Sequence, residues 1–158
     1  MSCLIRRAVV ADAFEACQIV RRSICELCRD DHEGDQATID QWLANKTVPN
    51  FEAWIGSDSH RAIMAETAAG LVGFGLMNLD GLVALLYVAP PSRFQGVSKA
   101  LLASLEEEAR RAGIREIRLG SSATALRFYA SCGFSSDGDP RPAFGITRSH
   151  PMSKRLAP

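Results

Sequence analysis

The sequence lacks an excess of either charge, a long apolar run and a regular cysteine framework. Its 18 basic residues balance 18 acidic ones, so no overall field attracts nucleic acid or an anionic membrane, and we expect neither as a partner. No stretch approaches the roughly 20 apolar residues of a membrane helix. The first residues do not follow a signal-peptide pattern, because acidic side chains appear at Asp12 and Glu15. We therefore expect a cytoplasmic protein.

The cysteines do not predict a disulfide scaffold or a metal site. There are five of them, an odd number without framework spacing. Cys25 and Cys28 form a C-x-x-C pair, but it lies inside a helical pattern and has no second pair beside it. Two interpretations stay open: small buried hydrophobic residues, which the context favours, or a redox or metal role. We expect no metal.

The composition that is present is that of an ordinary globular protein. The 158 residues are 47% hydrophobic and 23% charged, which is enough to bury a core. No internal repeat, linker or low-complexity segment interrupts the chain. We expect a single domain over residues 1–158.

Apolar periodicity predicts a β-α-α start. A strand is expected over residues 3–10. Asp12, with Glu15 at capping-box spacing, then begins a helix whose apolar residues recur at steps of three and four as far as Leu27. A second helix is expected over residues 36–45, ended by Pro49.

The period then changes to that of strands. Short runs over residues 61–66, 71–78 and 82–88 are separated by Gly-containing turns and predict an antiparallel meander. The remaining expected elements are a helix over 97–112, a strand over 114–119, a short helix over 123–131 and one or two strands within 143–156. This order predicts a mixed α/β domain on one sheet.

The turn after residue 88, APPSRFQGVSK, is the most informative stretch. Gly96 permits close approach of the backbone, and the first amides of the following helix are unpaired at its positive end. Lys99 and Arg93 add positive charge. Taken alone, the pattern fits an ordinary strand-to-helix turn as well as a phosphate-binding loop.

Two blocks together resemble a known family. Residues 93–98, RFQGVS, resemble the acyl-CoA-binding signature of the GNAT superfamily of N-acetyltransferases, Gln/Arg-x-x-Gly-x-Gly/Ala. Residues 122–134, SATALRFYASCGF, are similar to its later signature, a helix carrying Phe-Tyr and then Gly-Phe. The element order agrees along nearly the whole chain. Ser98 departs from the Gly/Ala position, Ser122 replaces a frequent asparagine, and no ionisable group precedes Tyr87 on the strand where relatives often carry a general base.

The resemblance implies a fold, a cofactor and its binding residues. The fold is a mixed, mostly antiparallel central sheet of six to seven strands flanked by about four helices. Acetyl-CoA serves as acyl donor, with the backbone of residues 86–88 pairing with the pantetheine arm and the amides of 94–99 holding the pyrophosphate. A splay after Val88, where Pro90 and Pro91 cannot continue the ladder, leaves that backbone free. The implied cofactor-binding residues are Leu86, Tyr87, Val88, Arg93, Phe94, Gln95, Gly96, Val97, Ser98, Lys99 and Ser122.

The resemblance also implies catalytic groups. Tyr129 occupies the position of the general acid that protonates the departing thiolate; the resemblance favours this role, and a core aromatic with a satisfied hydroxyl is the alternative. A backbone N–H near Tyr87 or Val88 would stabilise the oxyanion.

No general base can be assigned. The candidates are Glu26, Asp30, Asp31, His32 and Glu33. Among them, His32 has the best-matched intrinsic pKa, although a histidine in a polar loop is usually solvated. Trp42 and Trp54 are interpreted either as walls of an acceptor pocket or as core residues.

The predicted function is therefore transfer of an acetyl group to a primary amine by direct transfer in a ternary complex. The acceptor is a small-molecule or peptide amine: a polyamine or antibiotic, an amino acid, or a protein terminus. Balanced charge argues against a strongly cationic acceptor, although the acidic loop 30–35 could attract one ammonium group. A non-catalytic acyl-CoA-binding module is the alternative. A longer acyl donor and a homodimer stay open.

Overall fold

The computed structural model describes residues 2–143 and 146–158. The strands are β1 (Leu4–Arg7), β2 (His60–Thr67), β3 (Gly70–Asn78), β4 (Leu82–Val88), β5 (Glu116–Ser121), β6 (Ser135–Ser136), β7 (Arg141–Ala143) and β8 (Ile146–Arg155). The helices are α1 (Ala13–Leu27), α2 (Arg29–His32), α3 (Gln36–Leu43), α4 (Val48–Gly56), α5 (Val97–Arg111) and α6 (Leu126–Ser131), with 3₁₀ turns η1 (Val10–Asp12) and η2 (Pro90–Ser92).

One twisted sheet organises the chain, in the order β1-β2-β3-β4-β5-β8-β6, with β7 paired to β8. All its described pairings are antiparallel except β4 with β5. The expected mixed, mostly antiparallel sheet is therefore present. The described residues form eight strands because the tail adds β6, β7 and β8. They form more than four helices because α2 and α4 were not foreseen.

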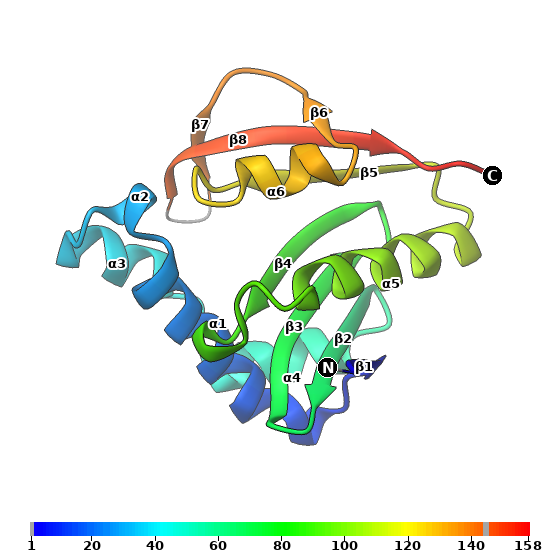
Figure 1. The fold of residues 1–158 in the computed structure, drawn as a ribbon, viewed down its shortest axis with the longest axis horizontal. Helices are drawn as coiled ribbons and strands as arrows, with labels where there is room; N and C mark the ends of the chain where they lie inside the picture. The colour runs from blue at the N-terminus through cyan, green and yellow to red at the C-terminus, as the bar shows by residue number, and fades with distance from the viewer. Residues whose placement is uncertain (1, 144–145) are drawn as a thin grey trace.

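The parallel pair β4–β5 joins the two halves of the sheet for only a short distance. Leu82 is opposite Arg118 and Val83 is opposite Leu119, and the pairing ends there. The two strands then diverge, as Figure 1 shows. The rest of β4 keeps its pairing with β3 up to Val88 opposite Gly73. The predicted splay is therefore present, and it begins earlier than expected, inside β4.

Helices cover both faces of the first half-sheet. Buried residues of α1, α3 and α4, including Trp42 and Phe51, pack with Phe74 on one face. Residues of α5, including Leu101 and Leu105, fill the other. Gly73 of β3 permits the close approach of α5, because a Cβ there would lie 2.9 Å from a methyl carbon of Leu101.

Several expected boundaries were wrong. Pro49 does not end a helix. It lies in the first turn of α4, where the backbone N–H that proline lacks would have no partner within the helix. The Thr47 side chain caps that helix by accepting from Asn50 N–H at 3.3 Å. Asp12 precedes α1 but makes no capping-box bond there. Its carboxylate instead accepts from Arg6 at 2.8 and 3.0 Å, and this hydrogen bond lowers its pKa.

The expected first strand, residues 3–10, is limited to β1 because the chain turns into η1. The part of the expected tail at residues 144–145 lies outside the described residues. Among the described residues, no helix is long and apolar enough to span a bilayer.

Candidate active site

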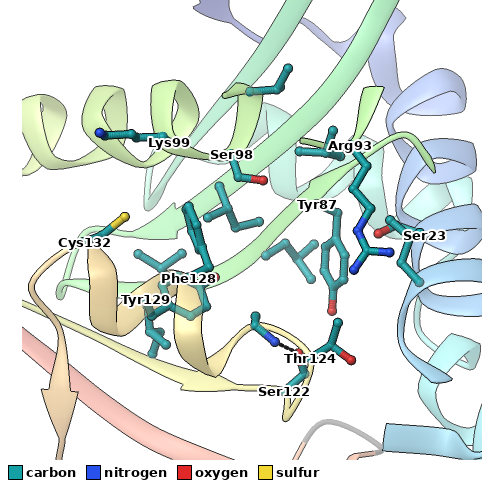
Figure 2. A pocket seen from close by; sticks show the side chains of 18 of the residues that line it. Ser23, Tyr87, Arg93, Ser98, Lys99, Ser122, Thr124, Phe128, Tyr129 and Cys132 are labelled. Carbon is teal, nitrogen blue, oxygen red and sulfur yellow. Dashed lines mark hydrogen bonds between the residues drawn. The ribbon is translucent and has the colours of Figure 1, made fainter. Parts of the chain in front are cut away.

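A cavity of about 640 Å³ opens where β4 and β5 diverge. It is bounded by β4, the loop that leads into α5, the start of α5, the end of β5, α6 and the end of α1. Eleven of the twelve predicted site residues line it: Leu86, Tyr87, Val88, Arg93, Phe94, Gly96, Val97, Ser98, Lys99, Ser122 and Tyr129. Gln95 does not line the cavity. The two sequence blocks therefore converge on one site (Figure 2).

The backbone of β4 presents alternate residues to this cavity. Ala89 N–H donates to Val72 C=O at 2.7 Å, toward β3. Because backbone groups alternate sides along a strand, Tyr87 also directs its N–H and C=O toward β3. Leu86 and Val88 direct theirs toward β5, where pairing has already ended at Val83. Of the two amides considered for the oxyanion, the geometry favours that of Val88.

The loop before α5 is curled by two left-handed residues. Gly96 has φ +79° and Phe94 has φ +64°. Turns of this kind line up successive N–H groups as an anion-binding concavity. A Cβ added to Gly96 would meet no atom within 4 Å, so the space above this glycine is open. The left-handed Phe94 was not foreseen. Its ring is 89% exposed, and the Arg93 guanidinium lies 4.5 Å from its centroid.

Helix α5 points its N-terminus at the cavity. The bond from Ala100 N–H to Gly96 C=O, at 3.1 Å, is the first of the helix, so the amides of Val97, Ser98 and Lys99 precede the intrahelical ladder. Ser98 is small and leaves them accessible. The 15 residues of α5 give this end a positive dipole that favours anions. The loop and helix together form a concave surface that favours a phosphate group.

Tyr129 lies across the cavity on α6. Its side chain is packed edge-on against Phe128 and Phe134, with centroid distances of 5.2 and 5.6 Å, and the residue is 7% exposed. Burial raises the pKa of Tyr129 above its ordinary value, and Cys132 adds a smaller effect. The ring is thus a core aromatic and also lines the cavity, so the two interpretations of this residue are compatible.

Tyr87 presents a second phenol to the same space. Burial raises the pKa of Tyr87, with smaller contributions from Cys28 and Tyr129, whereas a hydrogen bond with the Trp42 side chain lowers it. The Tyr87 hydroxyl lines the cavity and is available there as a donor. Sequence reasoning considered Tyr87 only for its backbone.

None of the five candidate bases lines the cavity. His32 is 2% exposed. One of its ring nitrogens is 2.9 Å from Ile24 C=O, and the other accepts from Gly34 N–H at 3.0 Å. Both ring nitrogens are therefore paired inside the fold, so His32 is not solvated and neither nitrogen faces the cavity. Asp31 accepts three hydrogen bonds from residues 123 and 124.

The charged side chains of the cavity therefore share one sign. Among the residues that the structure describes, its charged lining consists of Arg93 and Lys99, and no carboxylate or imidazole lines it. Ser122 accepts from Ala125 N–H at 3.2 Å and so supports the start of α6 (Figure 2). Trp42 and Trp54 are core residues and do not line the cavity.

Helix α1 contributes residues that sequence reasoning missed. Ser23 and Leu27 line the cavity from one face of α1, and Cys28 follows them. Their i, i+4 spacing was visible, but serine on an apolar helix face carries no distinctive signal. All five cysteines are free. Cys28 is buried and Cys25 is exposed, so the interpretation of the pair as buried residues holds only for Cys28.

The chain matches a family model and resembles solved structures. The family model described as Acetyltransferase (GNAT) domain matches residues 28–156. A GCN5-related N-acetyltransferase from Rhodopseudomonas palustris has a TM-score of 0.87 at 23% identity, covering 99% of this chain and 97% of that chain. No curated protein matches the sequence.

Two similar structures contain a CoA molecule. The paiA N-acetyltransferase from Thermoplasma acidophilum, in complex with coenzyme A, has a TM-score of 0.82 at 20% identity, covering 98% of this chain and 99% of that chain. The yncA protein from Salmonella typhimurium, with its cofactor acetyl-CoA, has a TM-score of 0.76 at 21% identity, covering 100% and 96%.

Proposed function

The chain belongs to the GNAT acetyltransferase family, and we propose that it transfers an acetyl group from acetyl-CoA to a primary amine in a ternary complex. The observation that carries the proposal is the divergence of β4 from β5 over a cavity lined by both signature blocks. The CoA-bound structures of similar fold support acetyl-CoA as the donor. The proposal treats residues 1–158 as one N-acetyltransferase domain.

Three groups hold the donor in this proposal. The amides of residues 94–99 receive the diphosphate at the positive end of α5. Leu86 and Val88 pair with the amide groups of the pantetheine arm, as an added strand would. When bound, acetyl-CoA supplies the thioester whose carbonyl carbon is attacked by the amine. The Val88 N–H stabilises the negative charge that develops on the thioester oxygen.

The transfer forms one bond and breaks another. The amine nitrogen bonds to the thioester carbon, the carbon–sulfur bond breaks, and the thiolate takes a proton. Tyr129 holds that proton at its hydroxyl, because its raised pKa keeps the phenol protonated. The ammonium proton of the acceptor leaves to water before attack, since no carboxylate or imidazole among the described residues lines the cavity. The second proton, which the nitrogen loses as the amide forms, returns through water to the Tyr129 oxygen, so that the phenol is restored.

Calorimetric titration with acetyl-CoA tests the donor site. Gly96→Glu places a carboxylate over the loop and is expected to abolish binding, whereas Gly96→Ala is the matched control. The alanine Cβ has open space and adds only the left-handed backbone cost of about 1–2 kcal/mol. Binding that survives Gly96→Glu would contradict the proposed diphosphate site.

A non-catalytic acyl-CoA-binding module is the second candidate, and the absence of a described base in the cavity favours it. Thiol release during incubation with acetyl-CoA and a panel of primary amines separates the two. Tight acetyl-CoA binding without release for any amine would favour the binding module.

The proposal includes a cytoplasmic location. All five cysteines are free, which is typical of reducing compartments. A homodimer stays a prediction, and sedimentation analysis would test it.

A further inference from the structure

Three donor groups gather on the α1 side of the cavity, away from Lys99. Figure 2 shows the Arg93 side chain leaving the loop and extending toward Ser23 and Tyr87, and all three residues line the cavity. Lys99 lies on α5 at the opposite side of this view. The positive charge of Arg93 also acts on Cys28, just beyond α1. The guanidinium is therefore on the side of the cavity that α1 closes.

Each of these groups can still donate a hydrogen bond. Ser23 is 4% exposed as a residue and lines the cavity. Its oxygen is not among the buried side-chain atoms that lack a partner, so the hydroxyl is open to the cavity and can donate to a molecule bound there. Tyr87 also lines the cavity, and burial raises the pKa of its hydroxyl, which therefore keeps its proton. Arg93 makes no ion pair with any described carboxylate.

We propose that Arg93, Ser23 and Tyr87 form a receptor for an oxyanion on the acceptor, so that the acceptor is an amine that also carries a carboxylate, as amino acids do. The inference rests on the proposed function in taking this cavity as the place where amine and thioester meet. Arginine binds carboxylates through paired N–H groups, and the two hydroxyls complete the donor set. A polycationic acceptor would instead meet two positive charges and no described negative one.

The apolar residues around the cavity restrict which side chain the acceptor can carry. Leu27, Leu86 and Phe128 line the same cavity and leave little for a charged side chain to bind. The stacking of Arg93 on Phe94 limits the freedom of the guanidinium. We therefore expect amino acids with uncharged side chains to be preferred over lysine and ornithine.

The test compares each L-amino acid with its own amide, in thiol-release assays at saturating acetyl-CoA. Acid and amide match in shape and differ in the carboxylate. The amine of the amide resembles a chain terminus, with a pKa of about 8, so intrinsic reactivity favours the amide. A preference for the acid of at least about tenfold in kcat/KM, the size expected of a charged hydrogen bond, supports the receptor.

Substitutions assign the preference to its residues. Arg93→Gln is expected to abolish the preference for the acid, measured as the ratio of kcat/KM for the amino acid to kcat/KM for its amide. Arg127 is an exposed arginine on α6 that does not line the cavity, so Arg127→Gln should retain this ratio. Ser23→Ala should lower the ratio by a smaller factor.

The outcomes separate this inference from the proposed function. Acetylation of amides as fast as acids overturns the receptor and leaves the acetyltransferase intact. A loss of acetyl-CoA affinity in Arg93→Gln with an unchanged ratio also overturns it and assigns Arg93 to the donor. If no amine is acetylated, the proposed function fails, and titration of the amino acids into the CoA-saturated protein decides the receptor. Binding by wild type but not Arg93→Gln supports it, and no binding overturns it.

Discussion

The carboxylate of Asp31 accepts hydrogen bonds from Thr124, a residue distant from it in the sequence. Its Oδ2 atom accepts from Thr124 Oγ1 at 2.7 Å and from Thr124 N–H at 3.2 Å, and its Oδ1 atom accepts from Ala123 N–H at 2.6 Å. Helix α2 is thereby joined to the loop that precedes α6, the helix that carries Tyr129. A residue first considered as a base is thus a structural tie beside the site.

Removing this tie should lower the stability of the protein. Asp31→Asn replaces one acceptor oxygen with a donor that faces an N–H or hydroxyl group, and we expect a loss of about 1–3 kcal/mol in the free energy of unfolding. Urea titration measures it. Asp30→Asn, an exposed neighbour without a described partner, is the control and should change stability little. Equal effects in both variants would contradict the tie.

Tyr129→Phe should separate chemistry from binding. The variant keeps the ring that packs against Phe128 and Phe134 and loses the hydroxyl. General-acid groups contribute about 10²–10⁴-fold, so we expect kcat to fall within that range while the calorimetric affinity for acetyl-CoA is retained. A variant with wild-type turnover would show that another group protonates the thiolate.

The pH profile should follow the acceptor rather than the enzyme. Because no described carboxylate or imidazole lines the cavity, kcat/KM should rise with pH until it reaches the pKa of the acceptor amine. The raised pKa values of Tyr87 and Tyr129 keep both phenols protonated beyond their ordinary range, so neither should cause an alkaline loss below about pH 10. An inflection that stays fixed when the acceptor amine is changed would contradict this.

Lys46 predicts a pH dependence of stability. Its residue is 2% exposed, and its ammonium donates to Trp42 C=O at 3.2 Å and to the Asn45 side chain at 2.7 Å. Burial lowers the pKa of Lys46 from 10.5 to about 8. Between these values the unfolded chain binds more protons, so this lysine makes the free energy of unfolding rise with pH from about 8 to 10.5.

Lys46→Met should flatten that rise. The quantity compared is the difference in the free energy of unfolding between variant and wild type at each pH, because Cys28 changes that free energy in the opposite direction. Burial raises the pKa of Cys28 from 9.0 to about 12, so its contribution to stability is lost as pH rises through that range. A difference between variant and wild type that is the same at pH 7 and pH 10 would contradict the role of Lys46.

Sequence reasoning succeeded where a local pattern fixes local structure. The apolar run 82–88 became β4 with the predicted bounds, and the loop around Gly96 adopts the left-handed turn that a glycine there permits. Helix α4 was missed because Pro49 can end one helix or open another, and the Thr47 cap that decides between them is a weak signal.

The roles of side chains that act across the chain could not be predicted. His32 lies in an acidic, polar stretch, yet α1 and Gly34 supply partners for both its nitrogens. Asp31 accepts hydrogen bonds from Ala123 and Thr124, which lie 92 and 93 positions further along the chain. Arg93 belongs to the signature loop by sequence, but its side chain extends toward Ser23 of α1 (Figure 2), and periodicity does not encode which helix faces the loop.

The short pairing of β4 with β5 has a thermodynamic consequence. Apart from the two opposed pairs at Leu82 and Val83, these strands are not bonded to each other. Under the proposed function acetyl-CoA binds between them, and it then stabilises the folded domain by RT ln(1 + [L]/Kd). Hydrogen exchange along β4 should therefore slow as acetyl-CoA saturates the protein.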